Sequence, residues 1–223
     1  MVTINSNYAA SFAANAAKQT QGDLNSAMEK LATGKRINFA KDDAAGSAIA
    51  MRIAAEVSGL GIASRNASDG QSLIDTADGA LKETHAVLLR MRELAVQAQN
   101  GTLATADKSA LGVEFDALEA EIDRISSNTT WAGKAIIDGS FSTGTELKID
   151  VGAASPITHL IKDLDAAGLG FASAHTVAQA STIAVVDAAI ATLSGERAGL
   201  GAISNRLDST VANLDQIRVN LSA

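Results

Sequence analysis

The stretch that decides the fold is IAAEVSGLGIASRNASDGQSLIDTADGALKETHAVLLRMRELAVQA, residues 53–98. When this stretch is read in sevens, the positions of one phase are all apolar: Ile53, Leu60, Ala67, Ile74, Leu81, Leu88 and Ala95. Most positions three residues further on are small, among them Ala63, Gly70 and Ala77. An apolar residue every 3.5 positions over this length is typical of long helices that pack side by side. The pattern predicts one long helix over about residues 44–100.

Other parts of the chain also predict helices. A second seam with the same spacing runs over residues 177–221 and includes Ile190, Leu193, Leu200, Leu207, Val211 and Leu214. A third helix is predicted over residues 104–127, with one apolar side and one acidic side. The first helix is predicted over residues 5–33, with Asn5 or Ser6 as its N-cap. Its apolar stripe is thin, so we expect it to be marginal without a partner.

The character of the sequence changes between residues 128 and 176, where glycine is frequent and the only proline occurs. Polar and apolar residues alternate over 145–151, which predicts a strand. We expect residues 134–137 to pair with this strand as a small β-hairpin, followed by a short helix or irregular segment at 157–164. The predicted fold is mainly α, an elongated bundle of long coiled-coil-like helices with a small β-hairpin region.

The chain is predicted to have three parts. Residues 1–33 form the N-terminal helix, residues 34–44 form a polar linker, and residues 45–223 form a long-helix core domain with the β-containing segment at about 128–176. Asp42 or Asp43 is the expected N-cap of the helix that follows the linker.

Composition narrows the class of protein. The chain has 223 residues, of which 45 are alanine, and it has one proline, no cysteine and a net charge of −7. Alanine is the best helix former, and the scarcity of proline favours long helices. The acidic balance argues against nucleic-acid binding, and no apolar run predicts a membrane span. The first residues do not resemble a secretory signal peptide.

The sequence contains no catalytic or cofactor-binding constellation that we recognise. The tripeptide Gly-Leu-Gly occurs at residues 59–61, 168–170 and 199–201, but each copy lacks the third glycine or alanine of a dinucleotide fingerprint. Close helix packing or a helix break explains these copies better. The histidines have no metal-ligand spacing, and no serine has the context of a hydrolase nucleophile. We therefore predict no enzyme activity, no metal and no cofactor.

Several long stretches closely resemble the bacterial flagellin family. They are LATGKRINFAKDDAAGSAIAMRI (31–53), GLGIASRNASDGQSLIDTADGAL (59–81), LLRMRELAVQAQNGT (88–102), ALEAEIDRISSNTTWAGKAIIDG (117–139) and GERAGLGAISNRLDSTVANL (195–214). Two shorter stretches, IDVGAAS (149–155) and DLDAAGLG (163–170), resemble the short links of the same family's β-containing region. Together the stretches cover more than half of the chain, and they are far more specific than a single short motif. On these stretches the chain is identified as a member of that family.

The resemblance implies a structural subunit of the flagellar filament, exported by the flagellar type III apparatus and polymerised outside the cell for swimming. This route would explain a secreted protein without a cleavable signal. The implied partners are other flagellin subunits, the export apparatus, and hook-associated and cap proteins. In the family, the N-terminal helix, here residues 1–33, lines the filament core.

The family's C-terminal seam continues into a second terminal helix that pairs with the first. Because the sequence ends at Ala223, we expect this C-terminal helix to be missing and stable filaments not to form. The same absence puts binding of the export chaperone in doubt, since the chaperone holds the C-terminal segment in the family.

The resemblance also implies recognition by the vertebrate Toll-like receptor that senses flagellin. Arg90, Leu94 and Glu114 match key positions of the family's recognition segment, with Gln97 nearby. Arg90, Leu94 and Gln97 fall within two helical turns, so one face could present them together. Without the resemblance, the simpler interpretation is two solvated charges and a core leucine.

Two other functions remain open. A hook–filament junction protein shares the terminal-helix plan, although the density of flagellin-like residues favours flagellin. A flagellin-like surface adhesin or glycan-binding protein is a second alternative, although one Trp and one Tyr offer little surface for stacking on sugars.

Overall fold

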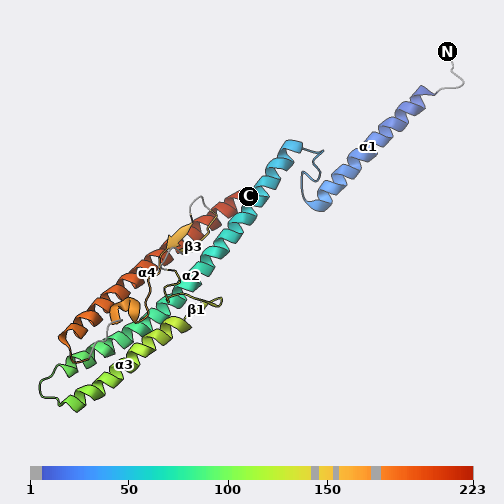
Figure 1. Cartoon of the computed structure of the whole chain (residues 1–223). Helices are drawn as coiled ribbons and strands as arrows, with labels where there is room; N and C mark the ends of the chain where they lie inside the picture. The colour runs from blue at the N-terminus through green and yellow to red at the C-terminus, as the bar shows by residue number, and fades with distance from the viewer. Residues whose placement is uncertain (1–6, 142–145, 153–155, 172–176, 223) are drawn as a thin grey trace. The chain divides into compact units, whose positions relative to one another are not determined.

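The computed structural model describes residues 7–141, 146–152, 156–171 and 177–222. Four long helices dominate it, and they are α1 (Tyr8–Thr33), α2 (Ala44–Ala98), α3 (Thr105–Asn128) and α4 (Ala180–Ser222) (Figure 1). Two small two-stranded sheets and a short irregular helical turn, η1 (Ala167–Phe171), lie between α3 and α4 in the sequence. The predicted mainly α fold is confirmed. The chain divides into two compact units, Met1–Glu56 and Val57–Ala223.

The first unit contains α1, and both ends of this helix have clear local causes. The side chain of Asn7 accepts a hydrogen bond from the Ala10 N–H at 3.0 Å, which caps the first turn. The predicted caps, Asn5 and Ser6, lie outside the described residues. Gly34 ends the helix in the left-handed conformation, with φ of 67°. No residue of α1 is buried, so the helix covers no core within the subunit.

The start of α2 is capped by Asp43. Its carboxylate accepts a hydrogen bond from the Gly46 N–H at 2.8 Å, and its backbone carbonyl accepts one from the Ser47 N–H at 2.9 Å. Asp42, the other predicted cap, instead stabilises the preceding turn. Its carboxylate accepts from two backbone N–H groups, those of Asn38 and Phe39, and these bonds lower the pKa of Asp42.

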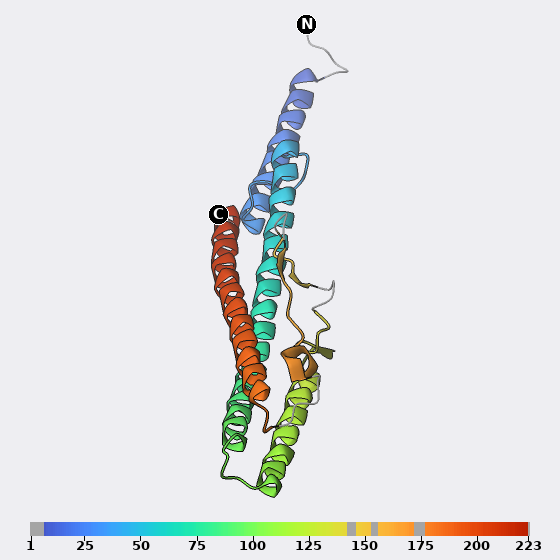
Figure 2. The same cartoon turned by 60° about the vertical axis from the view of Figure 1, so that its left-hand side comes forward.

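The second unit is built on three long helices that lie side by side, namely α3, α4 and the part of α2 from Val57 onward (Figures 1 and 2). Its core contains the apolar seam. Ile74, Leu81, Leu88, Leu193, Leu200, Leu207 and Leu214 are buried, whereas Leu60, Ile190 and Val211 are partly buried. The small residues of α2 are buried as well, with Ala67 and Ala77 at 0 % exposure. Small side chains at these positions leave room for the packed neighbours. Ile53 lies in the first unit and is half-buried.

The sheets differ from the predicted hairpin. Strand β2 (Lys134–Ala135) pairs with β1 (Thr130–Trp131), not with the strand at 145–151. The reason is the turn between them, where Ala132 and Gly133 both have positive φ, at 50° and 80°. Two such residues form the tight turn that fits the twist of adjacent strands. The partner of β2 is therefore its immediate neighbour in the sequence.

The predicted strand at 145–151 does form, as β3 (Leu147–Ile149), but Thr145 lies outside the described residues. Its partner is β4 (Ile157–His159), in a segment for which we expected a helix or irregular structure. Leu147, Ile149 and Ile157 are buried, so this sheet contributes one face to the core.

Within the described residues, α2 is long enough and apolar enough to cross a membrane by length and composition alone. This differs from the expectation that no apolar run approaches the length of a membrane span. None of the apolar window is buried within the subunit. One such helix is weak evidence for a membrane span.

Candidate functional site

The predicted recognition residues lie on α2 and α3, and an ion pair joins the two helices there. Arg90 of α2 donates two hydrogen bonds to Oε1 of Glu114 on α3, from Nε at 3.0 Å and from Nη2 at 2.7 Å. Its Nη1 donates to Oε2 of Glu93 at 3.0 Å. These bonds, the ones to Glu114 first, raise the pKa of Arg90 above its usual value. All three side chains remain substantially exposed, so solvent screens the pair.

The structure does not place the four predicted residues on one exposed face. Leu94 is fully buried, at 0 % exposure, and belongs to the core. Arg90, Gln97 and Glu114 are exposed. The ion pair brings Arg90 and Glu114 together, whereas Leu94 supports the helix from beneath.

Several side chains of this surface were not predicted from the sequence. Glu93 holds Arg90 at the favourable helical spacing of three residues, a signal that the sequence carries. Leu89 and Val96 on α2 are exposed at 44 % and 51 %, and Val113 on α3 is exposed at 71 %. Leu89 and Val96 are seven residues apart, so they share one face of α2. The sequence alone does not show that this face is left uncovered. The surface thus combines an ion pair with uncovered apolar groups.

Two further ion pairs join α2 to α4. Arg92 Nε lies 2.7 Å from Asp187 Oδ1, and Arg197 Nε lies 2.7 Å from Asp78 Oδ1. Hydrogen bonding to Asp187 raises the pKa of Arg92, and bonding to Asp78 raises that of Arg197. Solvent screens half-exposed pairs of this kind, so they fix the register of the two helices more than they stabilise the fold.

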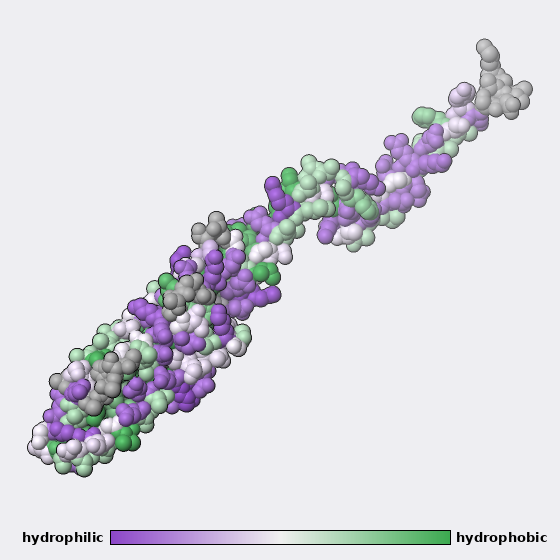
Figure 3. Space-filling model, in the orientation of Figure 1, coloured by the Kyte–Doolittle hydropathy of each residue, from purple (hydrophilic) through white to green (hydrophobic). Residues whose placement is uncertain are grey.

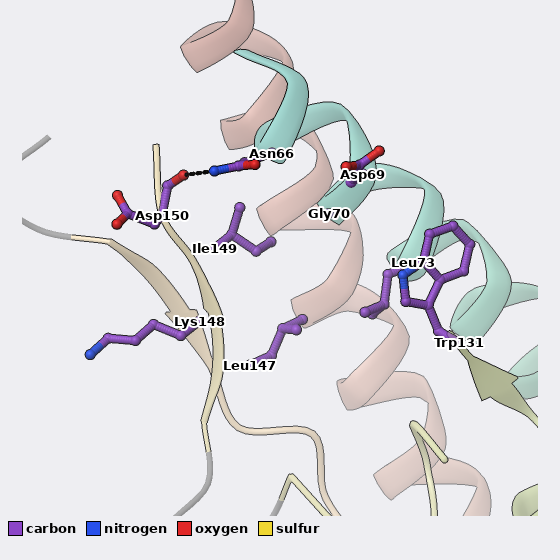
Figure 4. Close-up of a pocket in the computed structure, with 9 residues that line it drawn as sticks. All are labelled: Asn66, Asp69, Gly70, Leu73, Trp131, Leu147, Lys148, Ile149 and Asp150. Atoms are coloured by element: carbon purple, nitrogen blue, oxygen red, sulfur yellow. Dashed lines mark hydrogen bonds between the residues drawn. The ribbon is translucent and has the colours of Figure 1, made fainter. Parts of the chain in front are cut away.

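A groove of about 300 Å³ lies between α2, β1 and β3 (Figure 4). Trp131 and Leu73 lie together at one end, and Leu147 and Ile149 point toward the helices, while Lys148 points away. The Asn66 side-chain amide donates to the carbonyl of Asp150 at 3.1 Å and ties β3 to the helix. The lining residues bring no acid, base and nucleophile together.

The described residues contain no group of three or more His, Asp or Glu side chains placed to hold a metal ion. The arrangement that comes nearest to such a group surrounds the buried Glu196 of α4. Its Oε1 lies 3.3 Å from Lys162 Nζ, and its Oε2 lies 3.7 Å from His159 Nε2. This cluster anchors the segment after β4 on α4.

A second candidate region is the first unit, where large apolar side chains are exposed. Tyr8, Phe12 and Leu31 of α1 are exposed at 81 %, 78 % and 82 %. At the start of α2, Ile49 and Met51 are exposed at 50 % and 68 %. Figure 3 shows green apolar surface over these first turns of α2. Large apolar groups in this number, without a core beneath them, indicate a surface that a partner covers.

Comparison with known proteins agrees with these features. The family model of the bacterial flagellin N-terminal helical region matches residues 4–142, and that of the C-terminal helical region matches residues 183–223. The second match overturns the expectation that the C-terminal helical region is missing. Its residues include nearly all of α4.

Named flagellins are similar over most of the chain. The flagellin of Halalkalibacterium halodurans is 43 % identical over 203 residues, which cover 88 % of this chain and 74 % of that protein. The flagellin of Bacillus subtilis strain 168 is 39 % identical, with coverage of 99 % and 84 %.

Solved structures show the same arrangement. The crystal structure of Bacillus cereus flagellin has a TM-score of 0.58 at 35 % identity, covering 67 % of this chain and 88 % of that one. A putative flagellar hook-associated protein from Vibrio parahaemolyticus has a TM-score of 0.67, covering 82 % of this chain and 97 % of that one. Its identity is 15 %, so this likeness concerns the fold alone. The sequence identities thus favour flagellin over the hook–filament junction alternative. This chain belongs to the bacterial flagellin family, the non-enzymatic structural subunits that polymerise into the extracellular flagellar filament.

Proposed function

We propose that the exposed apolar side chains of the first unit form the main assembly contact of this filament subunit. The observation that carries this proposal is the absence of any buried residue among residues 7–56, despite Tyr8, Phe12, Leu31 and Met51. A helix of this length without packing is marginal in water, so a neighbouring subunit supplies what the subunit lacks. In this proposal residues 1–33 are the filament-core helix and residues 34–44 are the linker.

Substitution of two exposed residues tests the assembly contact. We expect the double variant Phe12→Ala and Leu31→Ala to reduce sedimentable polymer strongly in seeded assembly, because it removes two large apolar groups from the contact. The unfolding midpoint of the second unit should stay unchanged, since both side chains are exposed in the subunit.

The matched control is Gln19→Ala and Gln21→Ala, two exposed polar residues of the same helix. This variant should assemble like the unaltered chain. Undiminished polymer from the Phe12→Ala and Leu31→Ala variant would contradict the proposal.

Family membership supports further partners. We propose that the flagellar type III apparatus exports the chain, that hook-associated and cap proteins contact it at the ends of the filament, and that it serves swimming. The match to the family's C-terminal helical region also supports binding of the export chaperone.

We propose that the surface around Arg90 and Glu114 is recognised by the vertebrate flagellin-sensing Toll-like receptor. The supporting observation is the ion pair that unites residues from α2 and α3, with exposed Gln97 nearby. Leu94 is buried in the subunit, so its contribution to recognition would come from holding α2 in place.

A receptor reporter assay tests this second proposal. We expect Arg90→Ala and Glu114→Ala each to weaken the response by about tenfold, the equivalent of roughly 1.4 kcal/mol at an interface hot spot. Arg124→Ala is the matched control, because Arg124 forms a comparable exposed ion pair with Glu121 elsewhere on α3. Equal responses from the Arg90, Glu114 and Arg124 variants would refute the assignment.

A further inference from the structure

The turn between α2 and α3 contains Asn100 followed by Gly101, the single Asn-Gly pair of the sequence. Both residues are exposed, and nothing lies within 4 Å of where a Gly101 Cβ would be. The surroundings of this peptide bond therefore leave it open to water and to local rearrangement. The pair plays no part in the surfaces described above.

The Asn100 side chain folds back over the backbone that follows it. Its Oδ1 accepts a hydrogen bond from the Thr102 N–H at 3.1 Å, which is an Asx turn. This bond holds the side-chain amide beside the Gly101 peptide unit and withdraws electron density from Cγ. Both effects favour attack on Cγ by the Gly101 nitrogen.

The attacking group is also free. The backbone bonds of this turn run from the Asn100 N–H to the Gln97 carbonyl and from the Leu103 N–H to the Asn100 carbonyl. Over the described stretch 7–141, the Gly101 N–H donates to no acceptor. No hydrogen bond has to break before the nitrogen reacts.

Three other asparagines of the described residues do not meet these conditions. Asn128 is exposed at the end of α3, but the next N–H, that of Thr129, donates to the Ile125 carbonyl at 3.1 Å. Thr129 is also β-branched, which hinders approach to its nitrogen. Asn66 and Asn205 lie inside helices, where the following N–H belongs to the helical ladder.

We propose that Asn100 is a site of spontaneous deamidation in this protein. The Gly101 backbone nitrogen attacks Asn100 Cγ and loses its proton to water, a new C–N bond forms, and the side-chain nitrogen leaves as ammonia. The five-membered succinimide then adds one water molecule at either carbonyl. The product is aspartate or isoaspartate, with one water consumed, one ammonia released and no oxidant or reductant involved.

The product alters the turn in two ways. Either form adds one negative charge three residues beyond Gln97. Isoaspartate also inserts a methylene group into the backbone. In the unaltered chain the Leu103 N–H donates to the Asn100 carbonyl at 3.3 Å, and the insertion displaces this carbonyl.

The full-length chain is incubated in water enriched in oxygen-18, and peptides are mapped by mass spectrometry over time. We expect Asn100 to gain the mass of an amide-to-acid conversion with one labelled oxygen, and the isoaspartate form to exceed aspartate. Asn128 in the same sample is the internal reference and should stay unconverted over the same period.

Gly101→Ala is the matched variant, since Gly101 has no positive φ and open space for a methyl group. Its conversion at Asn100 should fall to the level of Asn128, with an unchanged unfolding midpoint. Conversion at Asn100 no faster than at Asn128, or equally fast in the Gly101→Ala variant, would overturn the proposal.

Discussion

Gly70 and Gly139 mark two places where one element approaches another too closely for a side chain. A Cβ on Gly70 would lie 2.5 Å from Cδ1 of Ile149, so this glycine lets β3 rest directly on α2. A Cβ on Gly139 would lie 2.9 Å from Oδ2 of Asp163, and Gly139 also has φ of 81°. At the residue scale, the second unit thus depends on small residues as much as on large apolar ones.

Asp163 carries a prediction at this scale. Burial, followed by the nearby charges of Asp165 and Asp138, raises the pKa of Asp163. A carboxyl with a raised pKa in the folded state loses stability as pH rises through that pKa. Asp163→Asn removes the charge and keeps an oxygen for the Asp165 N–H, which donates to Oδ1 at 3.3 Å.

We therefore expect Asp163→Asn to have a higher thermal unfolding midpoint than the unaltered chain near pH 7. The difference should disappear near pH 2.5, where Asp163 is protonated in both folded and unfolded chains. Exposed Asp116→Asn is the control for a general charge effect. A lower midpoint for Asp163→Asn near pH 7 would contradict this explanation.

Among the elements, α2 shows how one helix has both a face that packs in the core and a face with exposed apolar side chains. Leu88 is 0 % exposed, whereas its neighbour Leu89 is 44 % exposed. On α4 the burial pattern departs from the 3.5-residue seam. Between Leu193 and Leu200 the seam spacing falls on Arg197, but Glu196 is the buried residue, and Arg197 forms an ion pair with Asp78 of α2. The ammonium group of Lys162 accounts for this departure, since a buried carboxylate needs an opposite charge nearby.

The neighbouring leucines give a direct test of this division. Leu88→Ala should lower the free energy of unfolding by about 2–5 kcal/mol, because it removes buried contacts and leaves a cavity. Leu89→Ala should change it by less than about 0.5 kcal/mol, as expected for an exposed position. Urea unfolding measures both values. Equal losses from the two variants would show that α2 is rotated relative to the arrangement described here.

At the scale of the whole molecule, the two units differ in kind. All core residues lie in Val57–Ala223, whereas no described residue of the first unit is buried. A segment without a core cannot offset the conformational entropy lost on ordering it. The second unit is therefore stabilised by a core of its own, whereas the first unit depends, in the assembly proposed above, on contacts with neighbouring subunits.

The sequence by itself determined the helices and the family. The apolar period over Ile53–Ala98 is local information, because a helix places residues 3.5 positions apart on one face whatever surrounds it. The flagellin-like stretches also identify the family from the order of their residues alone. The predicted bounds of the four long helices differ from the observed ones by at most three residues.

Only the tertiary structure decided which strands pair, which charges meet and which leucine is covered. β3 pairs with β4 because β2, the partner predicted for β3, is paired with β1. Arg90 meets Glu114, 24 residues away, because α2 and α3 lie side by side. Leu94 and Leu89 are the same residue type five positions apart on one helix, yet one is buried and the other is exposed. Burial depends on what packs against each side of the helix, and that contact is made by distant parts of the chain.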